Sequence, residues 1–394
     1  MALGFSLPIS SAAISIFMIL SIILTLLDRS SYQKIYNLLK LRVFQSYLLF
    51  FILHIVGFSW LDVGAVDWHK SWMIWMIPIL AVSVSADIAK KGIFAFILGM
   101  FLAELYVYFN IFSIWTEYLR GVYGDHIMPI SHVAYNPILA VAIGLLMIRI
   151  INNWHNKNEV IIGIFFLTTM IINMFMTGGR AGQLGFIFIW LAVTYYYLRG
   201  KKNIFFGMFF TMIFVLITAY NFSSLFQSRV DRGIQEFASY INYLQNDEVA
   251  SYDVHAIGGT GLRLHFYETS LKLLKESPII GHGTGSTKNI FYKFVEENSA
   301  PWYIKTSNPH SNHSLILVQF GILGFLVYLN IFYQAIKAAK FMPKEYEYRA
   351  MAFFLPMFFF FINFFDSYLW GHHTQALFAY LSAILFRPDL YSKI

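Results

Sequence analysis

Three side chains in this sequence stand in segments suited to chemistry on phosphates and hydroxyls. Arg180 lies in TGGRAG at 177–182, Arg263 in GLRLHFYE at 261–268, and His310 in NPHSNHSL at 308–315. Glycines let a backbone approach its partner closely, and a guanidinium can hold two phosphate oxygens at once. A histidine can take a proton from a hydroxyl near neutral pH. The three segments therefore indicate phosphate binding and activation of a hydroxyl.

Each of these residues also has a simpler interpretation. Arg180 could simply be an arginine at a helix end whose side chain extends to the membrane surface. Arg263 could be a solvated charge or the ion-pair partner of Glu268. His310 is compatible with an incidental neighbour of a helix that is capped at 311–312. Without further context, the sequence leaves both interpretations of each residue open.

Other polar residues give weaker signals. Asp366, followed by His372 and His373, marks the end of the last apolar hairpin, where it is either a functional acid or a partner for an arginine. The two histidines lack acidic or cysteine neighbours at zinc spacing, and the chain has no cysteine, so no metal site is expected. The segment GHGTGS at 281–286 lacks the Gly-Lys-Ser/Thr ending of a nucleotide-binding loop, so no nucleotide cofactor is expected.

The composition predicts which kind of element must position these residues. Charged residues make up 12% of the chain and hydrophobic residues 58%, whereas soluble domains carry about 25% charged residues. Apolar runs of about 20 residues match the thickness of a bilayer. We therefore expect an all-α, polytopic membrane protein of about eleven spans, or twelve at most, with the lipid bilayer as its environment and no nucleic acid as a partner.

The expected spans are the eleven apolar runs of the chain. They are Leu7–Leu27, Val43–Leu61, Ser71–Ala86, Gly92–Phe112, Met128–Ile148, Val160–Met176, Gln183–Leu198, Ile204–Phe222, His313–Ile336, Ala350–Phe365 and Gln375–Phe386.

Basic residues are concentrated in alternate connections between these spans. One set of connections holds 17 of them: Arg29, Lys34, Lys40, Arg42, Lys90, Lys91, Arg149, Lys157, Arg199, Lys201, Lys202, Lys337, Lys340, Lys344, Arg349, Arg387 and Lys393. The short connections of the other set hold Lys70, Arg120 and Arg180. Positive charge stays on the cytoplasmic side. The first set and the C-terminus are therefore expected to face the cytoplasm, and the N-terminus the opposite side.

This topology places one long polar segment outside the membrane. We expect spans one to eight in 1–222, an extracytoplasmic loop in 223–312, and spans nine to eleven in 313–394. Within the loop, 260–276 has the periodicity of an amphipathic helix, which Pro278 and Gly281 end. The glycines Gly281, Gly283 and Gly285 predict a tight turn.

Three ordered motifs between Thr177 and Phe386 resemble those of the O-antigen ligase and O-antigen polymerase superfamily. The first is Thr-x-x-Arg-Ala, which ends here at Arg180 and Ala181. The second is Arg-x-x-x-Tyr/Trp-Glu, formed by Arg263, Tyr267 and Glu268, followed by SPIIGHG at 277–283.

The third motif is Pro-His-Asn-x-x-Leu, with a glycine eleven residues after the histidine. Counting back from Gly321 gives His310 rather than His313. The asparagine and leucine of the motif are displaced in this chain by one residue, to Asn312 and Leu315. We therefore take His310 as the functional histidine and keep His313 as the alternative.

The resemblance implies a GT-C-like membrane glycosyltransferase in the bacterial inner membrane, with its active site facing the periplasm. In this family a glycan moves from undecaprenyl diphosphate to a sugar hydroxyl, without a nucleotide or metal. Arg180 and Arg263 would then bind the diphosphate and His310 would be the base. The residues that would support them are Tyr267, Glu268, His313, Asp366 and His372.

Three activities remain compatible with the sequence. A ligase, which transfers the glycan to lipid A–core, is favoured because one long loop precedes the third motif. A polymerase would extend the lipid-linked glycan with the same donor and charges. A flippase or transporter for the lipid-linked saccharide would need charged residues at mid-span and symmetric repeats. In this chain the spans carry almost no charge, with Glu104 as the main exception, and we find no repeat.

Overall fold

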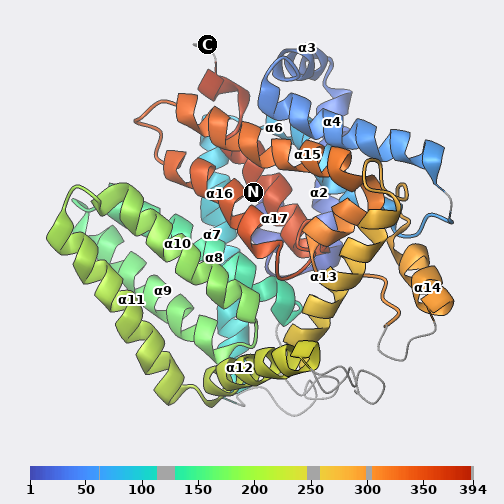
Figure 1. Ribbon diagram of the computed structural model, residues 1–394. Coiled ribbons are helices and arrows are strands. Elements are labelled where there is room, and N and C mark those ends of the chain that lie inside the picture. The colour runs from blue at the N-terminus through green and yellow to red at the C-terminus, as the bar shows by residue number, and fades with distance from the viewer. Residues whose placement is uncertain (62, 113–128, 246–257, 299–303, 392–394) are drawn as a thin grey trace.

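The computed structural model describes residues 1–61, 63–112, 129–245, 258–298 and 304–391. All regular elements in these ranges are helices (Figure 1). The expected all-α polytopic class is thereby confirmed.

The helices follow one another along the chain without any intervening strand in the described ranges. They are α1 (Ala2–Ser6), α2 (Ser11–Leu27), α3 (Arg29–Leu38), α4 (Arg42–Val56), η1 (Gly57–Trp60), η2 (Trp68–Ser71), α5 (Trp72–Trp75), α6 (Ile77–Val82), α7 (Ala86–Ile111), α8 (His132–Asn152), α9 (Lys157–Met176), α10 (Arg180–Leu198), α11 (Lys202–Phe222), α12 (Ser224–Gln245), α13 (Gly258–Glu276), α14 (Thr287–Asn298), α15 (Asn312–Phe341), α16 (Arg349–Ile362), α17 (His372–Leu385) and η6 (Pro388–Tyr391).

Seven of the described helices are long and apolar enough to cross a membrane. They are α4 with η1, α7, α8, α9, α10, α11 and α15. An eighth span is formed if α2 and α3, which meet at a bend of 101°, are counted together. The other three expected runs form shorter helices, namely α5 with α6, α16 and α17. A helix of 14 residues, such as α16, extends about 21 Å, which is less than the bilayer core.

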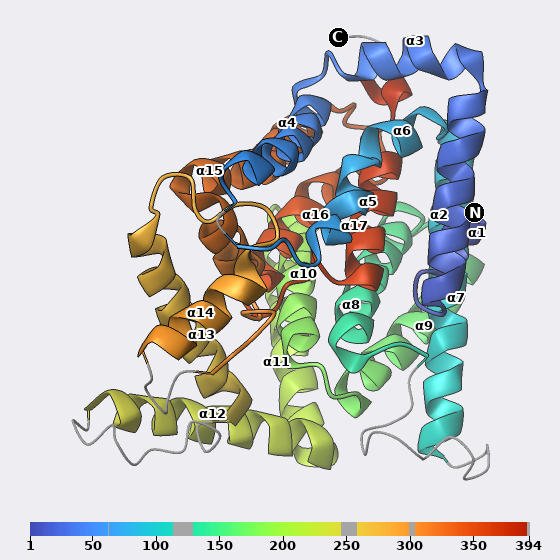
Figure 2. The same cartoon turned by 90° about the vertical axis from the view of Figure 1, so that its right-hand side faces the viewer.

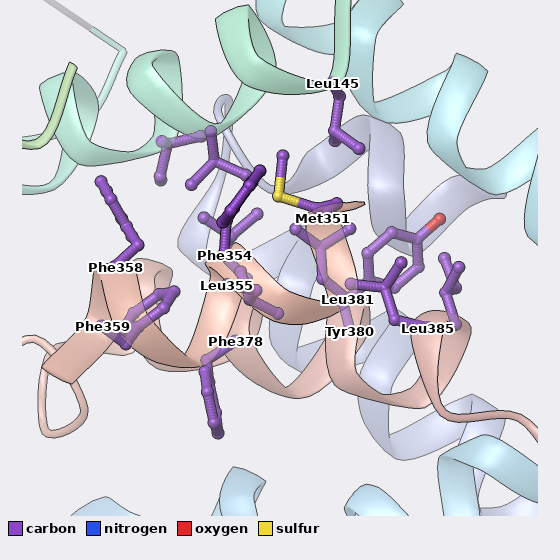
Figure 3. Packing of buried hydrophobic residues seen from close by; sticks show 14 of the residues in the cluster. Leu145, Met351, Phe354, Leu355, Phe358, Phe359, Phe378, Tyr380, Leu381 and Leu385 are labelled. Carbon is purple, nitrogen blue, oxygen red and sulfur yellow. The ribbon is translucent and has the colours of Figure 1, made fainter. Parts of the chain in front are cut away.

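The short helices α16 and α17 nevertheless lie at the centre of the molecule. Their side chains Phe358, Phe359 and Phe378 are fully buried, and Figure 3 shows them among the aromatic and aliphatic side chains of the two helices. Gly144 of α8 allows the close approach of Met351, because a Cβ atom there would lie 3.1 Å from its methyl group. This packing fixes the loop between α16 and α17, which carries Asp366.

Two amphipathic helices lie across opposite ends of the bundle. Figure 2 shows α3 across one end, beside the C-terminus, and α12 across the other. We call these the α3 end and the α12 end. The expected amphipathic helix at 260–276 is present as α13, which begins at Gly258. It runs from α12 toward the start of α15 (Figure 2).

The backbone of α15 is interrupted at Gly321, where φ is +59°. The segment 277–283 fills the interruption, because Pro278 and Ile279 accept hydrogen bonds from the N–H groups of 322 and 323. In return, the N–H groups of His282 and Gly283 bind the carbonyls of 318 and 319. Irregular backbone is tolerated at membrane depth where protein groups satisfy it. The expected tight turn is present, with positive φ at Gly281, Gly283 and Gly285.

Candidate active site

One face of α13 carries two of the motif residues. Thr260, Arg263 and Tyr267 follow one another at helical spacings of three and four residues, so their side chains project from the same side. The Nε of Arg263 donates to the carbonyl of Phe365 at 3.0 Å, and its Nη1 donates to the carbonyl of Gly259 at 3.0 Å. The guanidinium is therefore held between α13 and the loop that follows α16.

His310 occupies a constrained turn immediately before α15. Its φ is +50°, in a region that residues with a Cβ atom rarely adopt. The side chain of Asn308 holds this turn, since its Oδ1 accepts from the N–H of His310 at 3.0 Å and from the hydroxyl of Ser367 at 2.7 Å. Ser311 caps α15 by accepting from the N–H of Ser314. Backbone strain of this kind is concentrated at functional sites.

The turn brings the histidine against an acid from the far end of the chain. The Nδ1 of His310 lies 3.3 Å from both carboxylate oxygens of Asp366. The Nη2 of Arg263 lies 3.9 Å from Oδ2 of the same carboxylate. The ring of Phe266 stacks on the imidazole at a centroid distance of 6.1 Å. The carboxylate of Asp366 thus contacts both an imidazole and a guanidinium.

The surroundings of Asp366 favour its ionised form. Burial raises the pKa of this carboxyl, but the hydrogen bond and charge of His310 and the N–H of Ser367 act in the opposite direction. The net effect lowers the pKa below its ordinary value. The side chain of Asp366 is 11% exposed, whereas that of His310 is 42% exposed. The acid is therefore enclosed, and the histidine remains accessible to a substrate.

Tyr267 joins α13 to the two loops that carry His310 and Asp366. Its hydroxyl donates to the hydroxyl of Ser311 at 2.9 Å and also to the carbonyl of Phe364. Burial raises the pKa of Tyr267, which keeps the phenol protonated as a donor. This residue positions the cluster by fixing α13 against the two loops.

Arg180 is engaged by a carboxylate that sequence reasoning did not single out. It begins α10, and its Nη1 donates to Glu236 of α12 at 2.9 Å and to the hydroxyl of Thr260 at 2.9 Å. Burial raises the pKa of Glu236, but hydrogen bonds from Arg180 and Thr260 outweigh it and lower the pKa to about 2. Thr260 lies three residues before Arg263, so the first turn of α13 links the two arginines.

Three other sequence-predicted residues make contacts elsewhere. Glu268 pairs with Lys272 at 2.7 Å and faces away from Arg263. The Nε2 of His313 lies 3.0 Å from the carbonyl of Phe360, within a cage of aromatic rings between α15 and α16. The Nε2 of His372 lies 3.3 Å from the hydroxyl of Ser15 in α2. The structure does not bring these three side chains into the contacts that join His310, Asp366 and Arg263.

Asn308, Thr260 and Glu236 are the polar residues that sequence reasoning missed. Asn308 had a local signal, because Asn before Pro favours a turn in which the side chain binds the backbone two residues on. Glu236 lies 56 residues from its partner Arg180 and had no local signal.

Comparison with known proteins relates part of the chain to a described family. No curated protein matches the chain. Residues 165–329 match the family described as O-antigen ligase, a stretch that begins within α9 and ends within α15. It contains Arg180, Arg263 and His310, whereas Asp366 lies beyond it. The chain is thus a multi-pass membrane protein, and its residues 165–329 are similar to the O-antigen ligase family.

Proposed function

We propose that this protein is an O-antigen ligase-like glycosyltransferase. It moves a glycan from undecaprenyl diphosphate to a sugar hydroxyl of lipid A–core, by an inverting and metal-independent transfer. The observation that carries the proposal is the contact of Asp366 with both His310 and Arg263. This contact joins a base for the acceptor to a cation for the leaving group.

His310 acts as the general base. With Nδ1 toward Asp366, the neutral imidazole donates its N–H to that carboxylate, and Nε2 is then the proton acceptor. Asp366 orients the ring and stabilises the imidazolium that forms. A base positioned in this way typically accelerates transfer by about 10²–10⁴-fold.

Arg263 and Arg180 stabilise the leaving diphosphate. Charge develops on the bridging phosphate oxygen as the glycosidic bond breaks, and fixed cations lower the energy of that state. Arg263 approaches from the His310 side. Arg180 approaches from the start of α10, where Glu236 of α12 and Thr260 of α13 hold its guanidinium in place.

The transfer is then a single displacement. The acceptor oxygen forms a bond to the anomeric carbon while the bond from that carbon to the diphosphate oxygen breaks. The proton of the acceptor hydroxyl passes to Nε2 of His310 and afterwards to water. Undecaprenyl diphosphate leaves with the electron pair, and attack from the opposite side inverts the anomeric centre.

The site faces the periplasm in this proposal, from a protein of the bacterial inner membrane. Basic residues at the α3 end support this orientation, because α3 itself carries Arg29 and Lys34. Positive charge marks the cytoplasmic end. The α12 end is then periplasmic, with 223–312 as the inserted loop between the membrane parts 1–222 and 313–394.

Reconstitution with defined substrates tests the proposal. Purified protein in liposomes receives undecaprenyl-diphosphate glycan and lipid A–core, with a chelator present and without nucleotide. We expect glycan on the core, and His310→Ala should abolish it while donor binding persists. Arg263→Gln should weaken both binding and transfer, whereas Lys275→Gln, an exposed cation on the same helix, should not. Longer lipid-linked glycan would instead identify a polymerase, and the absence of both products would contradict a transferase.

A further inference from the structure

An open groove of about 710 Å³ lies between α10, α11 and α12. Its walls are formed by the apolar side chains Leu184, Ile187, Ile217, Phe226, Val230 and Phe237. In the most apolar 18-residue stretch of α11, only 11% of the residues are buried by protein, whereas 78% are buried in the corresponding stretch of α8. Since α11 is so little covered by protein, the groove opens sideways to the bilayer. We call it the lateral groove.

Two guanidinium groups enter the lateral groove at its α12 side. Arg180 and Arg229 both line it, one from the start of α10 and the other from α12. Gly233 leaves room for Arg180, because a Cβ atom there would lie 3.2 Å from its Nη1. Gly178 leaves room for Arg229 in the same way, because a Cβ atom at Gly178 would lie 3.2 Å from the Nη2 of Arg229.

The positions of these two glycines make the pairing specific. Gly233 lies one helical turn after Arg229 on α12, and Gly178 lies two residues before Arg180. The guanidinium of Arg180 therefore lies against Gly233 of α12, and the guanidinium of Arg229 lies against Gly178, which precedes α10. A glycine within a helix costs about 1 kcal/mol relative to alanine. The presence of Gly233 in the middle of α12 is explained by the space that the guanidinium of Arg180 requires.

The groove thus combines apolar walls that face lipid with two cations at one end. This combination suits an amphiphile that has a long hydrocarbon chain and a diphosphate head. Guanidinium groups bind phosphate oxygens in pairs, and burial of each CH₂ group contributes about 0.8 kcal/mol.

We propose that Arg229 is a further diphosphate-binding residue, and that the lateral groove holds the isoprenoid chain of the same lipid-linked donor. This inference rests on the proposed function for the identity of the donor. The diphosphate contacts Arg229 on the lipid side of Arg180, and the chain lies along α10 and α11. The sugar then points past Thr260 of α13, which contacts Arg180, toward Arg263 and His310.

Donor kinetics test the role of Arg229. Arg229→Ala should raise the KM for the donor by about tenfold or more and leave kcat within about twofold, since it removes binding rather than chemistry. Arg229→Lys, which keeps the charge, should recover part of the loss. The control is Arg232→Ala, because Arg232 is an exposed cation on the same helix. Equal KM values for Arg229→Ala and the wild type would overturn the assignment.

A photo-crosslinking measurement tests the groove independently of glycan transfer. The probe is an isoprenyl diphosphate that carries a benzophenone on its chain and no sugar. We expect label on α10 and α11, lost in Arg229→Ala and competed by undecaprenyl diphosphate but not by phosphatidylglycerol. Equal competition by phosphatidylglycerol, or label elsewhere, would overturn the inference. Arg229-dependent label without glycan transfer would uphold the groove and contradict only the proposed reaction.

Discussion

The Nδ1 of His310 faces the carboxylate of Asp366, at 3.3 Å from each of its oxygens. The two residues are 56 positions apart in the sequence, one in the turn before α15 and the other in the loop after α16. The contact couples the third motif of the family to an acid that lies outside the matched segment 165–329. In the proposed mechanism, Asp366 orients the imidazole ring of this base.

Asp366→Asn should therefore reduce turnover by about 10²–10⁴-fold while donor binding changes little, because the amide cannot stabilise an imidazolium. Initial rates with purified variants in liposomes measure this. Because the two residues act as a unit, the double variant with His310→Ala should be no slower than His310→Ala alone. His372→Ala, which changes a histidine near α2, is the control. Near-normal turnover in Asp366→Asn would remove the acid from the mechanism.

Gly321 is expected to tolerate no side chain. A Cβ atom there would lie 2.5 Å from the carbonyl carbon of Ile279, and φ is +59°. Gly321→Ala should lower stability by at least about 2 kcal/mol, seen as a lower thermal midpoint in detergent. Gly207→Ala provides the matched control, because a Cβ atom at 207 meets nothing within 4 Å. A midpoint unchanged from the wild type in Gly321→Ala would show that the segment 277–283 can move away.

The ion pair of Arg180 and Glu236 predicts a dependence of stability on pH. The pKa of Glu236 is lowered from 4.5 to about 2, so its contribution is complete above pH 4.5 and disappears as the pH falls toward 2. The difference corresponds to an upper limit of about 3 kcal/mol.

The thermal midpoints of the wild type and Glu236→Gln measure this contribution. The wild type should be more stable at pH 7, and the difference should shrink between pH 4.5 and pH 3. Glu276→Gln, which changes an exposed acid at the end of α13, should show no such trend. A difference that stays constant over this range would mean that the charge of Glu236 does not stabilise the fold.

The chain contains no cysteine, so single cysteines can report its orientation. Arg232→Cys on α12 should react with a membrane-impermeant maleimide added to intact spheroplasts. Lys344→Cys, between α15 and α16, should react only after the membrane is opened. Both residues are exposed, so a lack of reaction reflects the side of the membrane. The reverse pattern of labelling would place the His310 cluster on the cytoplasmic side and exclude the proposed donor orientation.

Several features follow from local properties of the sequence alone. Hydropathy and the scarcity of charge determine the polytopic helical class, because a helix satisfies its own backbone within a bilayer. The periodicity of 260–276 determines α13, and the glycines at 281, 283 and 285 determine a turn with positive φ. Motif order was enough to single out Arg180, Arg263 and His310.

The tertiary structure decided which of these residues meet. Hydropathy and motif spacing carry no information on how α12, α13 and the α16–α17 loop pack, so Glu236 as the partner of Arg180 was not foreseen. For the same reason the sequence left Asp366 as either a functional acid or a partner for an arginine, and in the structure it contacts both His310 and Arg263. Electrostatic contacts between distant segments depend on side chains converging within a few ångströms, which helix packing alone determines.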